Sequence, residues 1–203
     1  MTALVTVHTY PYVSDAEIGR ARLAADGISS VVRVDNEGGL NPGFYREYGV
    51  RLEVDEADLD DALDSLGVER LFVPREAARA MAVHALGSLP HEACGLVMFG
   101  DDGDLAFVSC LTNIDESPSR FTIDPGEHYG AMGFAASMGW TIGGVFHSHV
   151  SSEPLPSPAD IDGGGDPDWV HFIIGPVTGR KPSLRAFRFL EHGPVEVSLD
   201  VGT

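Results

Sequence analysis

The 203-residue chain is poor in basic residues, and Lys181 is its only lysine. Lysine and arginine together number 13 against 31 acidic residues, which leaves a formal net charge of −18. Such a chain repels phosphate backbones and anionic lipid unless basic residues gather locally. The densest basic group, Arg180–Arg188 near the C-terminus, has the pattern of exposed charges on a terminal hairpin. We therefore expect neither nucleic acid nor a membrane as a partner.

Long apolar runs and a disulfide framework are also missing. No stretch of about 18 apolar residues occurs, so no membrane-spanning helix is expected. The first residues, MTALVTVHTYPYVSDAE, lack the basic segment of a signal peptide, which favours a cytoplasmic protein. Both cysteines, Cys94 and Cys110, fall inside apolar runs, and we expect them to be buried, unreactive free thiols.

The sequence predicts two units with a boundary near Pro74. Residues 1–70 alternate short β-rich runs with helical segments in the order βαββα, which is typical of a small α+β unit. Ser14 and Glu17 have the spacing of a capping box at a helix start, and Gly27 is placed to end that helix. The other predicted elements are strands Leu4–Val7, Val31–Val34 and Val50–Val54, a loop over residues 38–43, and helix Asp58–Leu66.

Residues 75–203 predict a second unit with more strands than helices. The helix Glu76–Leu89 has an apolar stripe that includes Met81, Ala85 and Leu86, which indicates a face packed on the core. Asp124 followed by proline predicts the start of a second helix. The remaining predicted elements are strands Cys94–Phe99, Leu105–Leu111, Trp140–Phe146, Val170–Ile174, Ser183–Phe189 and Val195–Val201, and helix Pro125–Met138.

The segment His147–His149, of sequence HSH, follows one of these apolar runs. Side chains two residues apart on a strand point to the same face, so both imidazoles can reach one metal ion. After seven further residues, Ser157–Asp160 (SPAD) has the pattern of a helix start, with serine at the N-cap and proline at N1. Two histidines and one carboxylate leave a fourth tetrahedral position for water, which is typical of a catalytic zinc site.

Glu92 stands between the predicted helix Glu76–Leu89 and the predicted strand Cys94–Phe99. If that strand neighbours the one carrying the histidines, the Glu92 carboxyl can act as general base on a water at the metal. Each feature alone has an ordinary explanation as a chance histidine pair, a capping signal or a surface acid. Their conjunction points to catalysis. The other histidines, among them His128 and His171, show no ligand spacing and are interpreted as incidental.

Five residues at set spacing resemble the JAMM motif of the MPN-domain metalloproteases. They are Glu92, His147, His149, Ser157 and Asp160. The likeness extends over about residues 75–202, through PHEACGLVMFG, PSRFTIDPGEH, GWTIGGVFHSH and LRAFRFLEHGPVEVSL, and the compact form is similar to prokaryotic members. One departure is Val150, where the family often has proline, and it leaves the loop 150–156 less constrained.

The resemblance implies an α/β (α+β) fold with a mixed, curved sheet and flanking helices, as in cytidine deaminases. It implies one Zn²⁺ per chain, held by His147, His149 and Asp160. Glu92 would be the general base acting through water, and Ser157 would help to hold the tetrahedral oxyanion.

Compact prokaryotic members act on ubiquitin-like and sulfur-carrier proteins. The resemblance therefore predicts a zinc metallopeptidase or isopeptidase that hydrolyses the bond after a carrier's C-terminal Gly-Gly tail. One alternative is a non-catalytic MPN scaffold that binds a protein partner. Another is a nucleic-acid enzyme, since RadC-type proteins carry a similar pattern; they usually have asparagine where this chain has Ser148, and the charge of −18 opposes it.

Residues 1–70 resemble, more weakly, a small bacterial domain of proposed signalling role with ferredoxin-like topology. No motif in this segment carries chemistry. We expect it to recognise a partner, to mediate homodimerisation or to cover the cleft of the second unit, and a passive appendage is the alternative.

Overall fold

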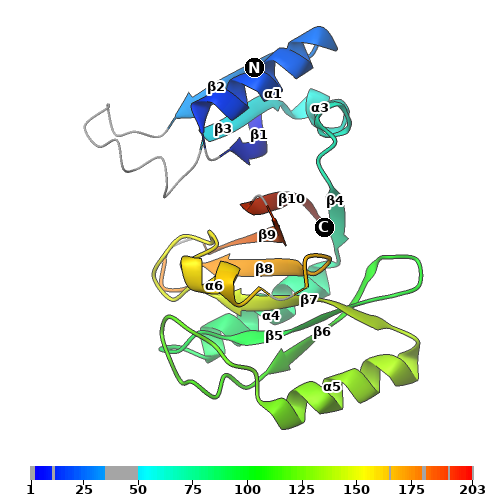
Figure 1. The fold of residues 1–203 in the computed structure, drawn as a ribbon, viewed down its shortest axis with the longest axis vertical. Coiled ribbons are helices and arrows are strands. Elements are labelled where there is room, and N and C mark those ends of the chain that lie inside the picture. Colours follow the sequence, from blue (N-terminus) through cyan, green and yellow to red (C-terminus); the bar gives the residue numbers. More distant parts are fainter. Residues whose placement is uncertain are drawn as a thin grey trace. The chain divides into compact units, whose positions relative to one another are not determined.

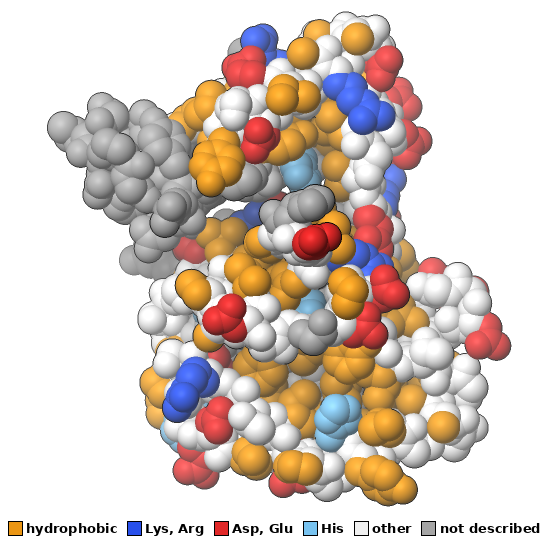
Figure 2. Space-filling view, viewed as in Figure 1, with side chains coloured by type: hydrophobic (Ala, Val, Ile, Leu, Met, Phe, Trp, Pro, Cys, Tyr) orange, Lys and Arg blue, Asp and Glu red, His pale blue; other side chains and the backbone are white. Residues whose placement is uncertain are grey.

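The structure, a computed structural model, describes residues 3–10, 12–34, 50–164, 166–179, 182–191 and 193–202. It divides into two compact units, Met1–Arg70 and Leu71–Thr203. The predicted loop 38–43 lies outside the described residues, as do Arg180 and Lys181 of the basic group. On the face seen in Figure 2, the lysine and arginine side chains drawn in colour are few and scattered.

The smaller unit is a three-stranded sheet with two helices (Figure 1). Its strands pair in the order β1-β3-β2, and both pairs are antiparallel. Because α1 connects β1 to β2 with β3 between them, the arrangement is a split βαβ unit; the ferredoxin-like assignment stays a prediction. The elements are β1 (Leu4–Tyr10), α1 (Val13–Ala25), β2 (Ser30–Val34), β3 (Val50–Asp55), the 3-10 turn η1 (Glu56–Asp58) and α3 (Leu59–Leu66).

The predicted capping box at Ser14 is wrong. The helix α1 begins earlier than predicted, at Val13, with Tyr12 at the N-cap and no side-chain cap. Ser14 therefore lies inside the first turn, where its hydroxyl donates to Asp15 Oδ1 over 3.3 Å. The predicted helix end is confirmed, because Gly27 has φ +80°, a conformation that favours glycine.

The larger unit is built on one seven-stranded sheet of order β4-β10-β9-β8-β7-β5-β6 (Figure 1). β7 and β8 run parallel, whereas β6–β5–β7 and β8–β9–β10 pair antiparallel, so the predicted mixed α/β fold is confirmed. The strands are β4 (Arg70–Val73), β5 (Cys94–Phe99), β6 (Leu105–Leu111), β7 (Thr141–Ser148), β8 (Val170–Gly175), β9 (Ser183–Leu190) and β10 (Gly193–Val201). The helices are α4 (Arg75–Gly87), α5 (Pro125–Met138) and α6 (Pro158–Asp162).

Most of these elements agree with the sequence. β5, β6 and α5 begin and end at the predicted residues, and Asp124 caps α5 by accepting from two backbone N–H groups. The apolar stripe of α4 is only partly buried: Met81 and Ala85 are in the core, but Leu86 is 55% exposed. The edge strand β4 was not predicted, and it pairs beside β10.

Different helices pack on the two faces of the large sheet, and one face is only partly covered. Alternate residues of a strand point to opposite faces. Val97 and Phe146 pack with Met81 of α4, whereas Leu96 packs with Ala131 of α5. On the face that α5 covers, β8 and β9 lie further from α5 and are covered by the segment that carries α6. Leu155 of this segment packs on a cluster of Ile173, Phe187 and Phe189. Gly164 lies so close to Phe189 that an added Cβ would touch its ring. A strip of sheet between α5 and α6 stays open.

Candidate metal centre

The structure brings the three predicted ligand residues together at the end of β7. Nε2 of His147 lies 3.1 Å from Nε2 of His149 and 3.3 Å from Oδ1 of Asp160. Nε2 of His149 lies 3.5 Å from Oδ2 of Asp160. Both histidines are buried, His147 completely. Among the described residues, this is the one group of three or more metal-ligating side chains that converge on a point.

The spacing of these atoms fits a tetrahedral metal ion. Metal–ligand distances of about 2.0–2.1 Å place neighbouring tetrahedral ligand atoms about 3.3 Å apart, close to the three measured separations. The Nε2 atoms of His147 and His149 are close enough to ligate one ion, and a cation between them would replace their mutual contact with two metal–ligand bonds. Two nitrogens and one carboxylate oxygen form a donor set typical of zinc and similar divalent metals.

Asp160 is held by its own helix start. Ser157 Oγ accepts from the Asp160 N–H over 3.2 Å, and Asp160 Oδ2 accepts from the Ser157 N–H over 2.7 Å, so the predicted N-cap at Ser157 is confirmed as a full capping box. Burial raises the pKa of Asp160, but hydrogen bonds with His147 and His149 outweigh it and hold the pKa well below its usual range. The carboxyl is therefore ionised and ready to bind a cation.

Hydrogen bonding and packing orient the two imidazoles. Nδ1 of His149 lies 2.8 Å from the Glu153 carbonyl oxygen, which fixes the proton on Nδ1 and leaves the Nε2 lone pair for a metal. The ring of His147 stacks on Phe121 with centroids 4.9 Å apart and an interplanar angle of 21°. Burial lowers the pKa of His147, so its ring is neutral, the form that ligates a metal. No sequence pattern pointed to Phe121, because it lies in the loop between β6 and α5 and meets His147 only in the folded structure.

Glu92 lies beside the histidines, because β5 and β7 are neighbours. Cys94 pairs with His147 across the two strands. Just beyond that pair, the Ala93 N–H donates to Ser148 Oγ over 2.9 Å, and the Ser148 N–H donates to the Ala93 carbonyl over 3.0 Å. These bonds fix the chain that leads into Glu92. Ser148 points away from its flanking histidines, as strand alternation requires, and its positioning role was missed from the sequence.

Glu92 is buried, with 5% of the residue exposed. Burial raises its pKa to about 7, although His149 nearby lowers it. Its backbone is anchored at both polar groups: the N–H donates to the Ser117 carbonyl over 2.9 Å, and the carbonyl accepts from Asn113 Nδ2 over 2.9 Å. A rigidly held carboxyl that titrates near neutral pH can both take up and release a proton.

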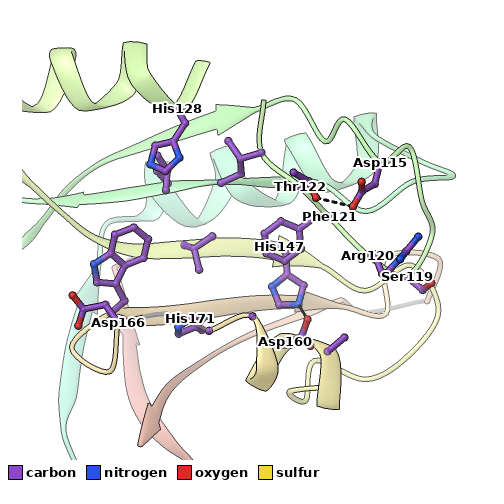
Figure 3. Close-up of a pocket in the computed structure, with 17 residues that line it drawn as sticks. Asp115, Ser119, Arg120, Phe121, Thr122, His128, His147, Asp160, Asp166 and His171 are labelled. Carbon is purple, nitrogen blue, oxygen red and sulfur yellow. Dashed lines mark hydrogen bonds and ion pairs between the residues drawn. The ribbon is translucent and has the colours of Figure 1, made fainter. Parts of the chain in front are cut away.

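A cleft of ≈ 490 Å³ runs past His147 and Asp160 over the open strip of the sheet. Figure 3 shows Ser119 and Arg120 near one end, His147 and Asp160 in the middle, and Asp166 and His171 toward the other end. The cleft is lined by Leu96, Asp115, Ser119, Arg120, Phe121, Thr122, Ile123, His128, Val145, His147, Ala159, Asp160, Gly163, Gly164, Asp166, Trp169 and His171.

Two histidines interpreted as incidental from the sequence line this cleft, His128 and, on β8, His171. His171 is 4% exposed, and its ring stacks on Phe189 with centroids 3.9 Å apart. Burial lowers its pKa to about 4, so the ring is neutral. The place of His171 in the cleft could not be predicted from the sequence, since it depends on how β8 aligns with β7.

The two cysteines differ, although the sequence predicted both to be buried. Cys94 is buried, and burial raises the pKa of its thiol to about 12. Cys110 is exposed: it lies on the edge strand β6, and its Sγ lies 3.8 Å from the Ala80 carbonyl oxygen of α4.

Fold and site together define a metal-binding α/β domain with a buried carboxyl beside the ligands. Residues 74–190 match the family described as prokaryotic homologs of the JAB domain, and the chain belongs to that family. The resemblance to compact prokaryotic JAMM domains is thereby confirmed.

Relatives are similar over the larger unit. A desampylase of Pyrococcus furiosus is 32% identical over 93 residues, which is 46% of this chain and 65% of the relative, slightly less than two thirds of its length. A CysO-cysteine peptidase of Mycobacterium tuberculosis is 27% identical over 135 residues, 64% of this chain and 90% of the relative. A solution structure of a Desulfitobacterium hafniense protein shares 31% identity with a TM-score of 0.60, over 65% of this chain and 92% of that one.

Among the helices that the structure describes, none combines the length and apolarity needed to cross a membrane.

Proposed function

We propose that the chain is a zinc-dependent peptidase that hydrolyses the bond after the C-terminal Gly-Gly of a ubiquitin-like or sulfur-carrier protein. The observation that carries the proposal is the convergence of three ligand atoms with a buried carboxyl of near-neutral pKa. The names of the desampylase and the CysO-cysteine peptidase support the substrate class.

Zinc held by His147, His149 and Asp160 would polarise the scissile carbonyl and make a water acidic enough to attack at neutral pH. Glu92, as carboxylate, accepts a proton from the attacking water and then donates it to the nitrogen of the leaving amine. Ser157 Oγ accepts a hydrogen bond from the Asp160 backbone, so its own proton is available to the oxyanion of the tetrahedral intermediate.

The larger unit carries all five of these residues. The smaller unit contains, among its described residues, no cluster of metal-ligating side chains. We assign residues 1–70 an accessory role in partner recognition, and residues 75–203 the catalysis.

The test is cleavage of carrier fusions, in which a ubiquitin-like protein ending in Gly-Gly is joined to a reporter through a peptide or an isopeptide bond. The zinc-loaded protein should cleave directly after the second glycine, and Glu92→Gln should abolish turnover while it still binds zinc. Tight carrier binding without cleavage would instead identify a scaffold. Cleavage that Glu92→Gln leaves unchanged would remove Glu92 from the mechanism.

A further inference from the structure

Glu92 stands outside regular secondary structure, between the end of α4 and the start of β5. Its backbone N–H and carbonyl therefore need partners from elsewhere in the fold. Both partners belong to one segment, residues 112–124, which links β6 to α5. The Glu92 N–H donates to the Ser117 carbonyl, and the side chain of Asn113 donates to the Glu92 carbonyl. This segment thus sets where the proposed general base lies.

The same segment forms one wall of the cleft. Figure 3 shows residues 119–122 along that wall, and the ring of Phe121 stacks on the proposed ligand His147. The segment is closed at its base, because the Ile114 N–H donates to the Thr122 carbonyl over 2.9 Å. The base Glu92, the ligand and the wall therefore meet at a single stretch of chain.

The side-chain amide of Asn113 joins Glu92 to this wall. Its Nδ2 donates to the Glu92 carbonyl over 2.9 Å and to the Arg120 carbonyl over 3.0 Å. Its Oδ1 accepts from the Asp115 N–H over 3.0 Å and from the Thr122 N–H over 3.1 Å. These four bonds use both protons of the amide and both lone pairs of its oxygen. Because two carbonyls need the nitrogen and two N–H groups need the oxygen, the amide fits in one orientation only.

A strained turn lies between these contacts. Glu116 has φ +44°, in the left-handed region that a residue other than glycine adopts at a cost in energy. It directly precedes Ser117, whose carbonyl receives the Glu92 N–H. Strain of this kind persists where surrounding contacts hold it. The Asn113 amide supplies such contacts, since it bonds to the chain before and after the turn.

We propose that Asn113 is a positioning residue, which holds Glu92 beside the metal centre and ties it to the wall of the cleft. The inference rests on the proposed function and deepens it. Proton transfer needs the base within hydrogen-bond reach of the water, and a displacement of about 1 Å can lower a rate about a hundredfold. Asn113 is not among the described residues that line the cleft, so it acts through the backbone of Glu92.

The test separates the two ends of the amide. Asn113→Asp keeps an oxygen for the two N–H groups of the wall, but it places a second oxygen opposite the Glu92 carbonyl, where no proton is left to donate. Asn113→Ala removes all four bonds. Asp102→Ala, which removes a side-chain bond to the Asp104 N–H in the exposed β5–β6 turn, is the matched control. Thermal melts of the zinc-loaded full-length proteins show that each variant is folded.

Cleavage of the carrier fusions gives the first readout. Asn113→Asp should lower kcat about tenfold or more and change KM less than about twofold, because the wall keeps its acceptor while Glu92 loses the bond that holds it. Asn113→Ala should lower kcat and also raise KM. The control should match the native protein. An unchanged kcat in Asn113→Asp overturns the proposal, and so does a KM that rises as much as kcat falls.

Amide hydrogen exchange, followed by NMR, gives a second readout that needs no substrate. In Asn113→Asp the Glu92 amide should exchange about tenfold faster than in the native protein, whereas the Thr122 amide should change less than about twofold. In Asn113→Ala both amides should exchange faster. Equal acceleration of both amides in Asn113→Asp indicates general loosening and overturns the proposal, as does an unchanged Glu92 amide.

The two readouts separate this inference from the proposed function. If the native protein cleaves no fusion while the exchange pattern is as expected, the peptidase function fails and the role of Asn113 in holding Glu92 stands. If the native protein and Asn113→Asp cleave with equal kcat, the peptidase function stands and the positioning role fails.

Discussion

Nε2 of His147 lies 3.1 Å from Nε2 of His149, and the remaining nitrogen of His149 is tied to the Glu153 carbonyl. Both Nε2 atoms therefore lie near one point, and the ionised Asp160 adds an oxygen to it. The negative charge of that carboxylate favours a cation there.

The first prediction concerns metal content. Native protein should carry about one zinc per chain, and Asp160→Ala should lose most of it, because two neutral imidazoles alone form an incomplete site. Elemental mass spectrometry gives the ratio. Asp162→Ala, at the exposed end of the same helix α6, is the matched control and should keep its zinc. Native protein that takes up no zinc even when zinc is added contradicts the site.

The second prediction concerns the pH dependence of stability in the metal-free protein. The pKa of Glu92 is raised from 4.5 to about 7, so the protonated carboxyl favours folding. That stabilisation is fully present below about pH 4.5 and is lost as pH rises through 7, for a total of about 2–3 kcal/mol.

In Glu92→Gln the side chain at position 92 cannot ionise, so the free energy of unfolding should not show this decrease as the pH rises. Urea unfolding of both proteins at pH 5 and pH 8 gives the difference, since all other groups are shared. The free energies of unfolding should diverge in favour of the variant at the higher pH. If the free energy of unfolding changes equally with pH in both proteins, folding does not shift the pKa of the Glu92 carboxyl.

The third prediction concerns the helix start that holds Asp160. Ser157→Ala removes the acceptor for the Asp160 N–H and should destabilise the protein by about 1 kcal/mol. It should also weaken zinc binding by about tenfold or more, because the cap orients a ligand. Competition with a zinc-binding dye measures the affinity. Ser157→Thr, which can cap, should restore most of it, and equal affinities of the alanine variant and the native protein would show that the cap does not position Asp160.

The fourth prediction concerns the thiols. A thiol reagent at pH 8 should modify Cys110 in the folded protein and Cys94 only after unfolding, because Cys94 is buried with its pKa raised to about 12. The number of modified thiols per chain should therefore rise from about one to about two on addition of denaturant. Cys110→Ser is the control, and it should show no reactive thiol when folded. Rapid labelling of Cys94 in the folded control contradicts its burial.

The ligand set could be predicted because each part is local. His147 and His149 share a face by strand alternation alone, and the capping box at Ser157 is a pattern of four residues. Glu92 needed one assumption, that β5 neighbours β7, which the structure confirms.

What was missed depends on pairing between distant segments. The place of His171 in the cleft follows from the register of β8 against β7, and nothing in the sequence sets that register. β4 is too short to show alternation, and its partner β10 lies at the other end of the chain. The prediction at Ser14 failed for a different reason: a capping pattern identifies residues able to cap, but α1 begins with Tyr12 at the N-cap and no side-chain cap at all.

β7 and β8 are parallel, and parallel strands cannot be joined by a hairpin. The chain must cross over between them, and residues 149–169 are that crossover. It carries His149 and Asp160, so a metal ion bound to these two residues and to His147 would tie the crossover back onto β7, the strand it has just left. A cut in the crossover between His149 and Ser157 would separate the ligands into two fragments, whereas a cut in the β5–β6 turn would leave all of them on one. The parallel pairing of β7 and β8 thus requires the same crossover that supplies two of the three metal ligands.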